Sequence, residues 1–227
     1  MIQTCIVTNL RRPEMLLETL RSLARSGIGA ITLCCDANTE PSPANHAKVF
    51  LRALETTGRL CKAAGSDWAL LCEDDIAVPV GFGDYLLRLC PLLQPHKDAL
   101  GFATLFCSAG YRDWAAAHPV QEAPQFGRLI PNDCYAGTLC LLVPVASISK
   151  LLPVMQSVCR NPGAADWGGD RILGEAARRE GLEAWCHVPS LVDHRGRTSS
   201  TVASRSDNLA AVAADYVGDE WKLEARS

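Results

Sequence analysis

A chain of 227 residues is long enough to bury a sizeable core, and one domain is the expectation at this length. Its composition, 48% hydrophobic and 21% charged, excludes an intrinsically disordered chain. A formal net charge of −3 excludes bulk attraction to nucleic acid or to an anionic membrane, so binding to either needs a local basic patch.

Signals for a membrane or for secretion are not recognisable in the sequence. No apolar run reaches the length of a membrane span, and residues 2–8 look like a strand rather than a leader. The eleven cysteines include no Cys-x-x-Cys pair, and an odd number without a leader argues against a disulfide framework. We therefore expect a cytoplasmic protein with reduced cysteines and no membrane span.

Residues 1–100 alternate between strand and helix patterns. Apolar spacing and end signals predict strands at 2–8, 30–35 and 68–79, and helices at 13–27, 44–64 and 82–93. Short connections between such units favour a parallel sheet with right-handed crossovers.

The pattern is less regular after residue 100. We expect strands at 100–106, 128–130, 135–143 and 184–188, and helices at 145–158, 170–180 and 206–217. Pro153 is expected to interrupt its helix, and residues 108–125 read as a long irregular loop of the kind that forms lids or binding segments. The whole chain predicts the α/β class, with a mixed, mainly parallel sheet flanked by helices.

Three consecutive carboxylates, Glu73, Asp74 and Asp75, follow the apolar run of residues 68–72. Such a run is typical of a strand buried on both faces, and open α/β sheets bind ligands outside the carboxyl ends of their strands. Because three acids repel one another, a cation should share the site. An acidic turn leading to a helix is the alternative. The functional interpretation is a divalent metal, Mg²⁺ or Mn²⁺, held by oxygen ligands.

Other strand ends carry polar groups as well, namely Thr8 and Asn9 after the first strand and Asp36 after the second. This spacing suggests a nucleotide lying across the first three strands, with Asp36 accepting hydrogen bonds from a ribose or base. Neither a Gly-x-Gly-x-x-Gly fingerprint nor a Gly-x-x-x-x-Gly-Lys-Ser/Thr loop is present. Without a glycine cradle, a metal ion is the natural means of holding a diphosphate.

Three segments resemble motifs of the GT-A-type glycosyltransferases, which use nucleotide-sugar donors. Residues 4–13 resemble the first nucleotide-binding unit, and residues 71–76 resemble the acidic metal motif in its Glu-Asp-Asp form. Residues 189–200 resemble the family's Pro-Ser-Leu-Val-x-His-x-Gly-x-x-Ser-Ser ending. The resemblance implies a single GT-A-like domain over residues 1–227, with a nucleotide-binding half at 1–100 and an acceptor and catalytic half at 101–227.

The same resemblance implies a role for each acid of the triplet. Asp75 would be the direct metal ligand, and His194 would approach the metal from the opposite wall. Glu73 and Asp74 would face the ribose or the donor sugar. For His194 the alternative is a loop histidine bonded to the backbone.

Residues implied to bind the nucleotide-sugar come from both ends of the chain: Thr8, Asn9 and Arg11 near the start, and Arg197, Ser199 and Ser200 near the end. The latter group would close over the diphosphate, with Arg195 as a substitute for Arg197. A planar guanidinium suits phosphate, although a solvated basic loop is the alternative for either arginine.

Residues 167–170, Trp-Gly-Gly-Asp, resemble the segment that supplies the catalytic base of inverting members, but one acid of the family's Trp-Gly-Gly-Glu-Asp form is missing. Asp166 and Asp170 are then rival bases. Asp170 stands at a predicted helix start, where capping alone would account for an aspartate. We assign the base to Asp170, because Trp167 is expected to face the core and turn Asp166 away. An inverting transfer needs a general base at the acceptor hydroxyl.

The acceptor is the least determined part of the prediction. Tyr111 and Trp114 offer aromatic faces to a sugar or a base, with core packing as the alternative. A saccharide, a protein and a modified DNA base stay open as acceptors. DNA would need a local basic stripe, for which the candidates are Arg11, Arg12, Arg112, Arg195, Arg197 and Arg205.

The sequence therefore predicts a metal-dependent glycosyltransferase that moves a sugar from a UDP-sugar to an acceptor hydroxyl, with inversion as the expected outcome. A nucleotidyltransferase using the same carboxylate–metal site is one rival. It usually carries a glycine-rich loop after the first strand, and residues 9–12 are not glycine-rich. The other rival is a module that binds a nucleotide-sugar without turnover.

Overall fold

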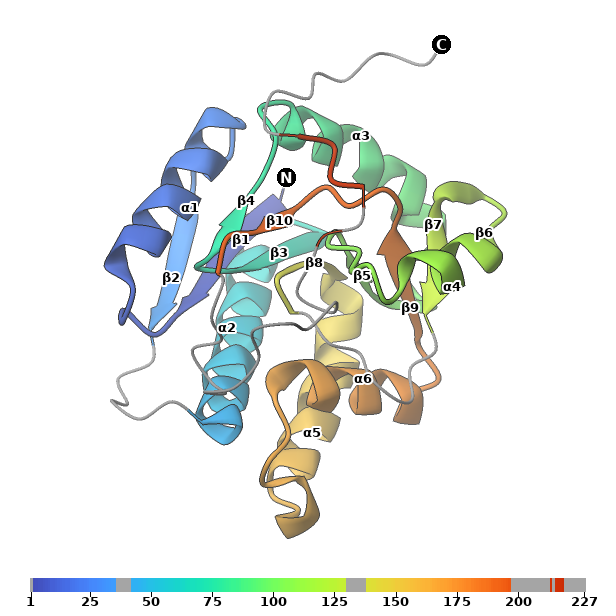
Figure 1. Ribbon diagram of the computed structural model, residues 1–227. Coiled ribbons are helices and arrows are strands. Elements are labelled where there is room, and N and C mark those ends of the chain that lie inside the picture. The colour runs from blue at the N-terminus through green and yellow to red at the C-terminus, as the bar shows by residue number, and fades with distance from the viewer. Residues whose placement is uncertain (1, 36–41, 130–137, 197–212, 214, 219–227) are drawn as a thin grey trace.

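The computed structural model describes residues 2–35, 42–129, 138–196, 213 and 215–218. An eight-stranded sheet runs through it (Figure 1). Across the sheet the strands are β2 (Ile31–Cys35), β1 (Ile2–Thr8), β3 (Trp68–Glu73), β8 (Cys140–Pro144), β5 (Leu100–Thr104), β9 (Glu183–His187), β7 (Ala123–Leu129) and β6 (Pro119–Val120). β8 and β7 run antiparallel to both of their neighbours, and the other strands share one direction. The predicted mixed, mainly parallel sheet is confirmed.

Helices cover both faces of this sheet. They are α1 (Pro13–Arg25), α2 (Pro43–Ala64), α3 (Phe82–Leu93), α4 (Arg112–Ala117), α5 (Val145–Cys159) and α6 (Gly169–Arg179), with short 3₁₀ turns η1 (Gln94–His96) and η2 (Pro162–Ala164). Figure 1 shows α2, α5 and α6 together on one side, with α1 and α3 on the other. Successive β3 residues alternate between two cores, because Leu71 packs with the α2 and α5 side chains and Leu70 with those of α1 and α3.

Local signals fix the first half of the chain close to prediction. Pro13 occupies the first turn of α1, and the Ser42 hydroxyl caps α2 by accepting from the Asn45 amide. Gly65 ends α2 in the left-handed region, at φ +61°. In the second half, Pro153 does not interrupt α5 as predicted. Pro153 and Ser149 are both exposed, where the loss of one amide partner by the Ser149 carbonyl costs less than it would in the core.

The apolar run that carries the acid triplet is not one strand. β3 ends at Glu73, the chain turns, and β4 (Ile76–Ala77) leaves the main sheet to pair with β10 (Asp193–His194). On the other side of this segment, hydroxyls of α1 take the place of a strand. Thr19 exchanges two hydrogen bonds with the main chain of Ile76, and Ser22 does the same with Val78. The segment after the triplet is thereby held on both edges.

The prediction for residues 108–125 as an irregular loop is wrong. The Ser108 carbonyl accepts from the amides of Tyr111 and Arg112, which starts α4, and β7 begins at Ala123. α4 and β6 are too short to show periodicity, and β7 is held in the sheet by its pairing with β9. The strand predicted at 135–143 lies at 140–144, and residues 130–137 lie outside the described residues.

The helix predicted at 206–217 is not helical in its described part. Ala213 forms an isolated β-bridge with Ser108, and the Val217 amide donates to the Ser190 carbonyl at 3.3 Å. Long-range main-chain bonds replace helical ones there; residues 206–212 and 214 lie outside the described residues. None of the described helices is long and apolar enough to cross a membrane, and every described cysteine is free.

Candidate functional site

The carboxyl ends of β1 and β3 lie side by side and bring two polar segments together. Val7 pairs with Glu73 in the parallel register, so Thr8 and Asp74 both follow the last paired positions. The Thr8 hydroxyl donates to Asp74 Oδ2 at 2.5 Å and accepts from the Leu10 amide at 3.1 Å. The predicted juxtaposition of the first strand end and the acid triplet is therefore present.

His194 reaches the triplet through β10. Pairing of His194 with Ile76 places its Nε2 atom 3.2 Å from Asp75 Oδ2, and the Arg195 amide donates to the Asp75 carbonyl at 2.7 Å. The backbone of Gly196 lies so close to the Asp75 carboxylate that a Cβ on this residue would be 2.2 Å from Asp75 Oδ2. Only glycine fits this position without displacing the carboxylate.

Asp75 is the acid with unfilled bonding capacity. Its side chain is 6% exposed, and Oδ2 contacts both His194 and the Arg12 guanidinium, whose Nη2 lies 3.0 Å away. Oδ1 is buried and has no hydrogen-bond partner among the described residues. A buried carboxylate oxygen without a partner is costly, and a bound cation would satisfy it.

The pKa values of Asp74 and Glu73 are shifted in opposite directions. Burial, reinforced by the charges of Asp75 and Glu73, raises the pKa of Asp74 to about 6, although Thr8 and Arg12 oppose the shift. Burial alone would also raise the pKa of Glu73. The hydrogen bond and charge of His46, with a further hydrogen bond from the Thr138 hydroxyl, outweigh burial and lower this pKa to about 2.

His46, in the first turn of α2, joins Glu73 to the start of α6. Its Nε2 lies 3.6 Å from Glu73 Oε1, and its Nδ1 accepts from the Gly169 amide at 3.4 Å. An accepting Nδ1 leaves the ring proton on Nε2, facing the carboxylate. Burial lowers the pKa of His46, but the hydrogen bond and charge of Glu73 outweigh it, so the net direction is upward.

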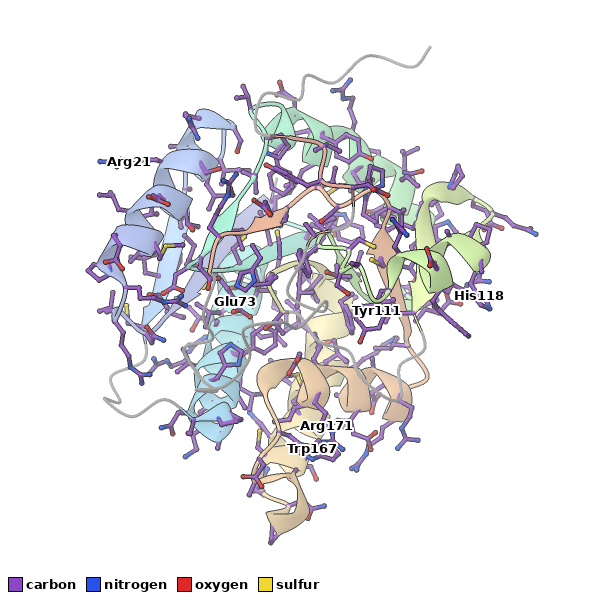
Figure 2. The ribbon with its side chains drawn as sticks, viewed as in Figure 1. Arg21, Glu73, Tyr111, His118, Trp167 and Arg171 are labelled. Atoms are coloured by element: carbon purple, nitrogen blue, oxygen red, sulfur yellow. The ribbon has the colours of Figure 1, made fainter. Side chains whose placement is uncertain are left out.

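The two rival aspartates have different surroundings. Asp166 is exposed, whereas Asp170 is half-buried in the first turn of α6, where its Oδ1 accepts from the Arg171 amide at 2.8 Å. Trp167 packs against the core on the α2–α5–α6 side, with the Arg171 guanidinium 4.1 Å above its ring. In Figure 2 Trp167 and Arg171 lie below Glu73, apart from the ends of β1 and β3. Asp170 also contributes to the electrostatic environment of His46.

The predicted acceptor residues lie on and beside α4. Tyr111 is half-buried against the core, and Trp114 is 40% exposed. The Trp114 ring stacks on His118 with centroids 3.9 Å apart, and its indole donates to the Arg128 carbonyl at 3.2 Å. In the view of Figure 2, Tyr111 lies between Glu73 and His118, which is at the outer edge.

The remaining predicted binding residues divide into three groups. The Asn9 side chain accepts from the Arg11 amide at 3.0 Å, a local turn. Arg195 pairs through Nε with Asp193 Oδ2 at 2.9 Å. The others lie outside the described residues: Asp36, Arg197, Ser199 and Ser200.

Sequence reasoning missed His46 and Thr138 as site residues, and it named Arg12 only within the motif of residues 4–13 and for a basic stripe, not as a partner of Asp75. Arg12 follows Arg11 directly, and only the start of α1 decides which guanidinium reaches Asp75. His46 and Thr138 are single polar residues in unremarkable stretches, and no local signal marks either of them.

Comparisons with known proteins give a likeness of folds only. No protein-family model matches the sequence, and no curated protein matches it. Among solved structures, a glycosyltransferase involved in glycosylation of the major capsid of the virus PBCV-1 is similar, with a TM-score of 0.48 and 11% identity over 82% of this chain and 83% of that one. A Drosophila β-1,4-galactosyltransferase 7 mutant, crystallised with manganese, UDP-Gal and xylobiose, has a TM-score of 0.45 and 14% identity over 87% and 72%. The chemistry of this chain must rest on its own residues.

Proposed function

We propose that this protein is a metal-dependent glycosyltransferase that moves a sugar from a UDP-sugar to an acceptor hydroxyl. The observation that carries the proposal is Asp75, a buried carboxylate with one unpartnered oxygen beside the His194 imidazole. The donor class comes from the motifs that resemble those of the GT-A-type enzymes. Two of these motifs, the acid triplet and the histidine segment, are more than 100 residues apart in sequence and meet at this site.

The residues present fit a hard divalent ion, Mn²⁺ or Mg²⁺. Asp75 and His194 would hold it. The described residues contain no group of three or more His, Cys, Asp and Glu side chains arranged for a metal. An ion with few protein ligands that completes its shell with phosphate oxygens and water is the usual pattern for Mg²⁺ in nucleotide sites. When bound, it would stabilise the negative charge of the leaving diphosphate.

Other residues would bind and orient the donor. Thr8, Asn9 and Arg11 line the end of β1, and Asp74 and Glu73 would face the ribose or sugar hydroxyls. Glu73 remains ionised at neutral pH because its pKa is about 2. It can therefore accept hydrogen bonds from the donor, but it is too weak a base to remove a proton from the acceptor hydroxyl. Asp36 would accept hydrogen bonds from the ribose or base. Arg197, Ser199 and Ser200 would close over the diphosphate, with Arg195 as a substitute for Arg197.

Asp170 would serve as the general base at the acceptor hydroxyl, giving inversion. Its half-buried position and the His46 link from Gly169 to Glu73 support Asp170 over the exposed Asp166. Tyr111 and Trp114 would offer aromatic surface to the acceptor, whose class stays open among saccharide, protein and modified DNA.

The test is release of product from UDP-sugars in the presence of Mn²⁺. A glycosyltransferase with slow donor hydrolysis releases UDP, a nucleotidyltransferase exchanges pyrophosphate, and a binding module releases nothing. Asp75→Ala should abolish UDP release and the metal-dependent part of UDP binding measured by calorimetry. Asp67→Ala, at the exposed opposite end of β3, is the matched control and should change neither. Equal UDP affinity with Mn²⁺ and after thorough chelation would contradict the metal.

A further inference from the structure

Arg12 is the cation that the structure seats on Asp75. It stands at the N-cap of α1, and its carbonyl accepts from the amides of Met15 and Leu16, so the helix start fixes its backbone. Its side chain is 22% exposed, and Nη2 lies 3.0 Å from Asp75 Oδ2. At this exposure the guanidinium is packed against Asp75 and still accessible from solvent.

The oxygen that Arg12 contacts is the one that His194 also faces. Asp75 Oδ2 has Arg12 Nη2 at 3.0 Å and His194 Nε2 at 3.2 Å, while Oδ1 has no partner in the described structure. A divalent ion that fills Oδ1 would therefore lie close to a positive guanidinium held on Oδ2, the other oxygen of the same carboxylate. The two cations repel each other at such short range in a partly buried site.

A diphosphate would resolve that repulsion. Guanidinium groups bind phosphate oxygens through paired, charge-assisted hydrogen bonds, so Arg12 has a better partner when a nucleoside diphosphate is present. Binding of the metal and binding of the diphosphate would then each make the other more favourable. Such coupling between two ligands is reciprocal.

We propose, on the basis of the proposed function, that Arg12 is a positioning residue that makes metal and nucleotide binding interdependent. Without donor it holds the Asp75 carboxylate that would bind the metal, and with donor and metal it transfers to the diphosphate. Free metal ion is then bound weakly, and the complete metal–donor pair is bound tightly.

Calorimetry with Mn²⁺ alone, UDP alone and UDP at saturating Mn²⁺ tests this exchange. Arg12→Gln removes the charge and keeps a hydrogen-bond donor. It should bind Mn²⁺ alone about fivefold more tightly or better, and the factor by which Mn²⁺ improves UDP binding should fall by a similar amount, the lower range for linked sites. Arg21→Gln is the matched control, because Arg21 is exposed on α1 and points away from Glu73 in Figure 2.

A second measurement uses the wild-type chain, in case Arg12→Gln does not fold. The Arg12 side-chain Nε signal in heteronuclear NMR, assigned by its loss in Arg12→Lys, should move when Mg²⁺ and UDP are added together and stay near its place with Mg²⁺ alone. Unchanged Mn²⁺ affinity in Arg12→Gln, or an Arg12 signal indifferent to UDP, would show a purely structural ion pair. A wild-type protein that binds neither Mn²⁺ nor UDP refutes the proposed function, and the exchange with it.

Discussion

Two histidines of the same C-terminal segment have opposite kinds of environment. His187, at the end of β9, is closed: its Nδ1 donates to the Pro189 carbonyl at 2.7 Å, so Nε2 accepts from the Tyr85 hydroxyl at 2.6 Å. His194, on β10, faces a carboxylate whose other oxygen has no partner among the described residues. A histidine saturated by protein groups stabilises the fold, whereas one beside an unfilled carboxylate leaves room for a ligand.

The hydrogen bonds around His187 also help to position the segment that carries His194. The Tyr85–His187–Pro189 chain fixes the main chain immediately before the 190–196 segment. The Ser190 hydroxyl then accepts from the Cys107 amide at 3.0 Å and donates to the Val192 carbonyl at 2.8 Å. These hydrogen bonds fix the course of the main chain that leads to β10, where His194 contacts Asp75. Predictions that separate the two environments therefore separate stability from chemistry.

The largest expected effect is on turnover, at the proposed base Asp170, which the His46 contacts link to Glu73. Asp170→Asn keeps a side-chain oxygen for the Arg171 amide and removes basicity, so turnover with a UDP-sugar should fall by about 10² to 10⁴. UDP affinity and melting temperature should stay near the wild-type values. Tyr85→Phe, in the closed environment, should leave turnover within about twofold. If Asp166→Asn abolishes turnover while Asp170→Asn does not, the assignment of the base is reversed.

The next effect is a loss of stability in acid, caused by His187. Burial lowers the pKa of His187 to about 4, with the Pro189 hydrogen bond opposing the shift, while an unfolded histidine titrates near 6.5. The unfolded chain therefore binds the extra proton first. The stability from His187 is complete above about pH 6.5 and is lost as the pH falls toward 4, on the order of 3 kcal/mol in total.

Denaturant unfolding at a series of pH values, compared with His187→Gln, isolates this contribution. Other groups, including His46 with its raised pKa, affect both proteins equally. The variant should be less stable at pH 7 and show a flatter curve between pH 6.5 and 4. Parallel curves for the two proteins would mean that folding does not lower the pKa of His187.

The smallest effect is expected at His194 itself. His194→Ala should raise the Mn²⁺ concentration needed for UDP binding by about 10-fold, the scale of a supporting ligand. The melting temperature should hardly change, because β10 is a short strand near the surface whose main-chain pairing with Ile76 and Ala77 does not need the ring. His187→Gln should show the reverse pattern, with lower stability and an unchanged metal titration. An unchanged titration in His194→Ala would make it a second structural histidine.

The sequence by itself determined the elements whose signals are local. Pro13 and the leucine spacing after it predict α1, and the apolar run before Glu73 predicts the strand that forms β3. α3 begins and ends as predicted, at Phe82 and Leu93. In each case periodicity and end residues are sufficient, because the element is long enough to show them.

Only the tertiary structure decided which partner each acid of the triplet has. Consecutive residues at a strand end point in different directions, and so Glu73 meets His46 of α2, Asp74 meets Thr8 of β1, and Asp75 meets Arg12 and His194. The sequence likewise did not predict the start of β7 at Ala123, because the pairing of this strand with β9 is a contact between distant residues. Contacts between residues far apart in sequence leave no periodic trace, and it is these contacts that set the pKa of each acid and leave one oxygen of Asp75 unfilled.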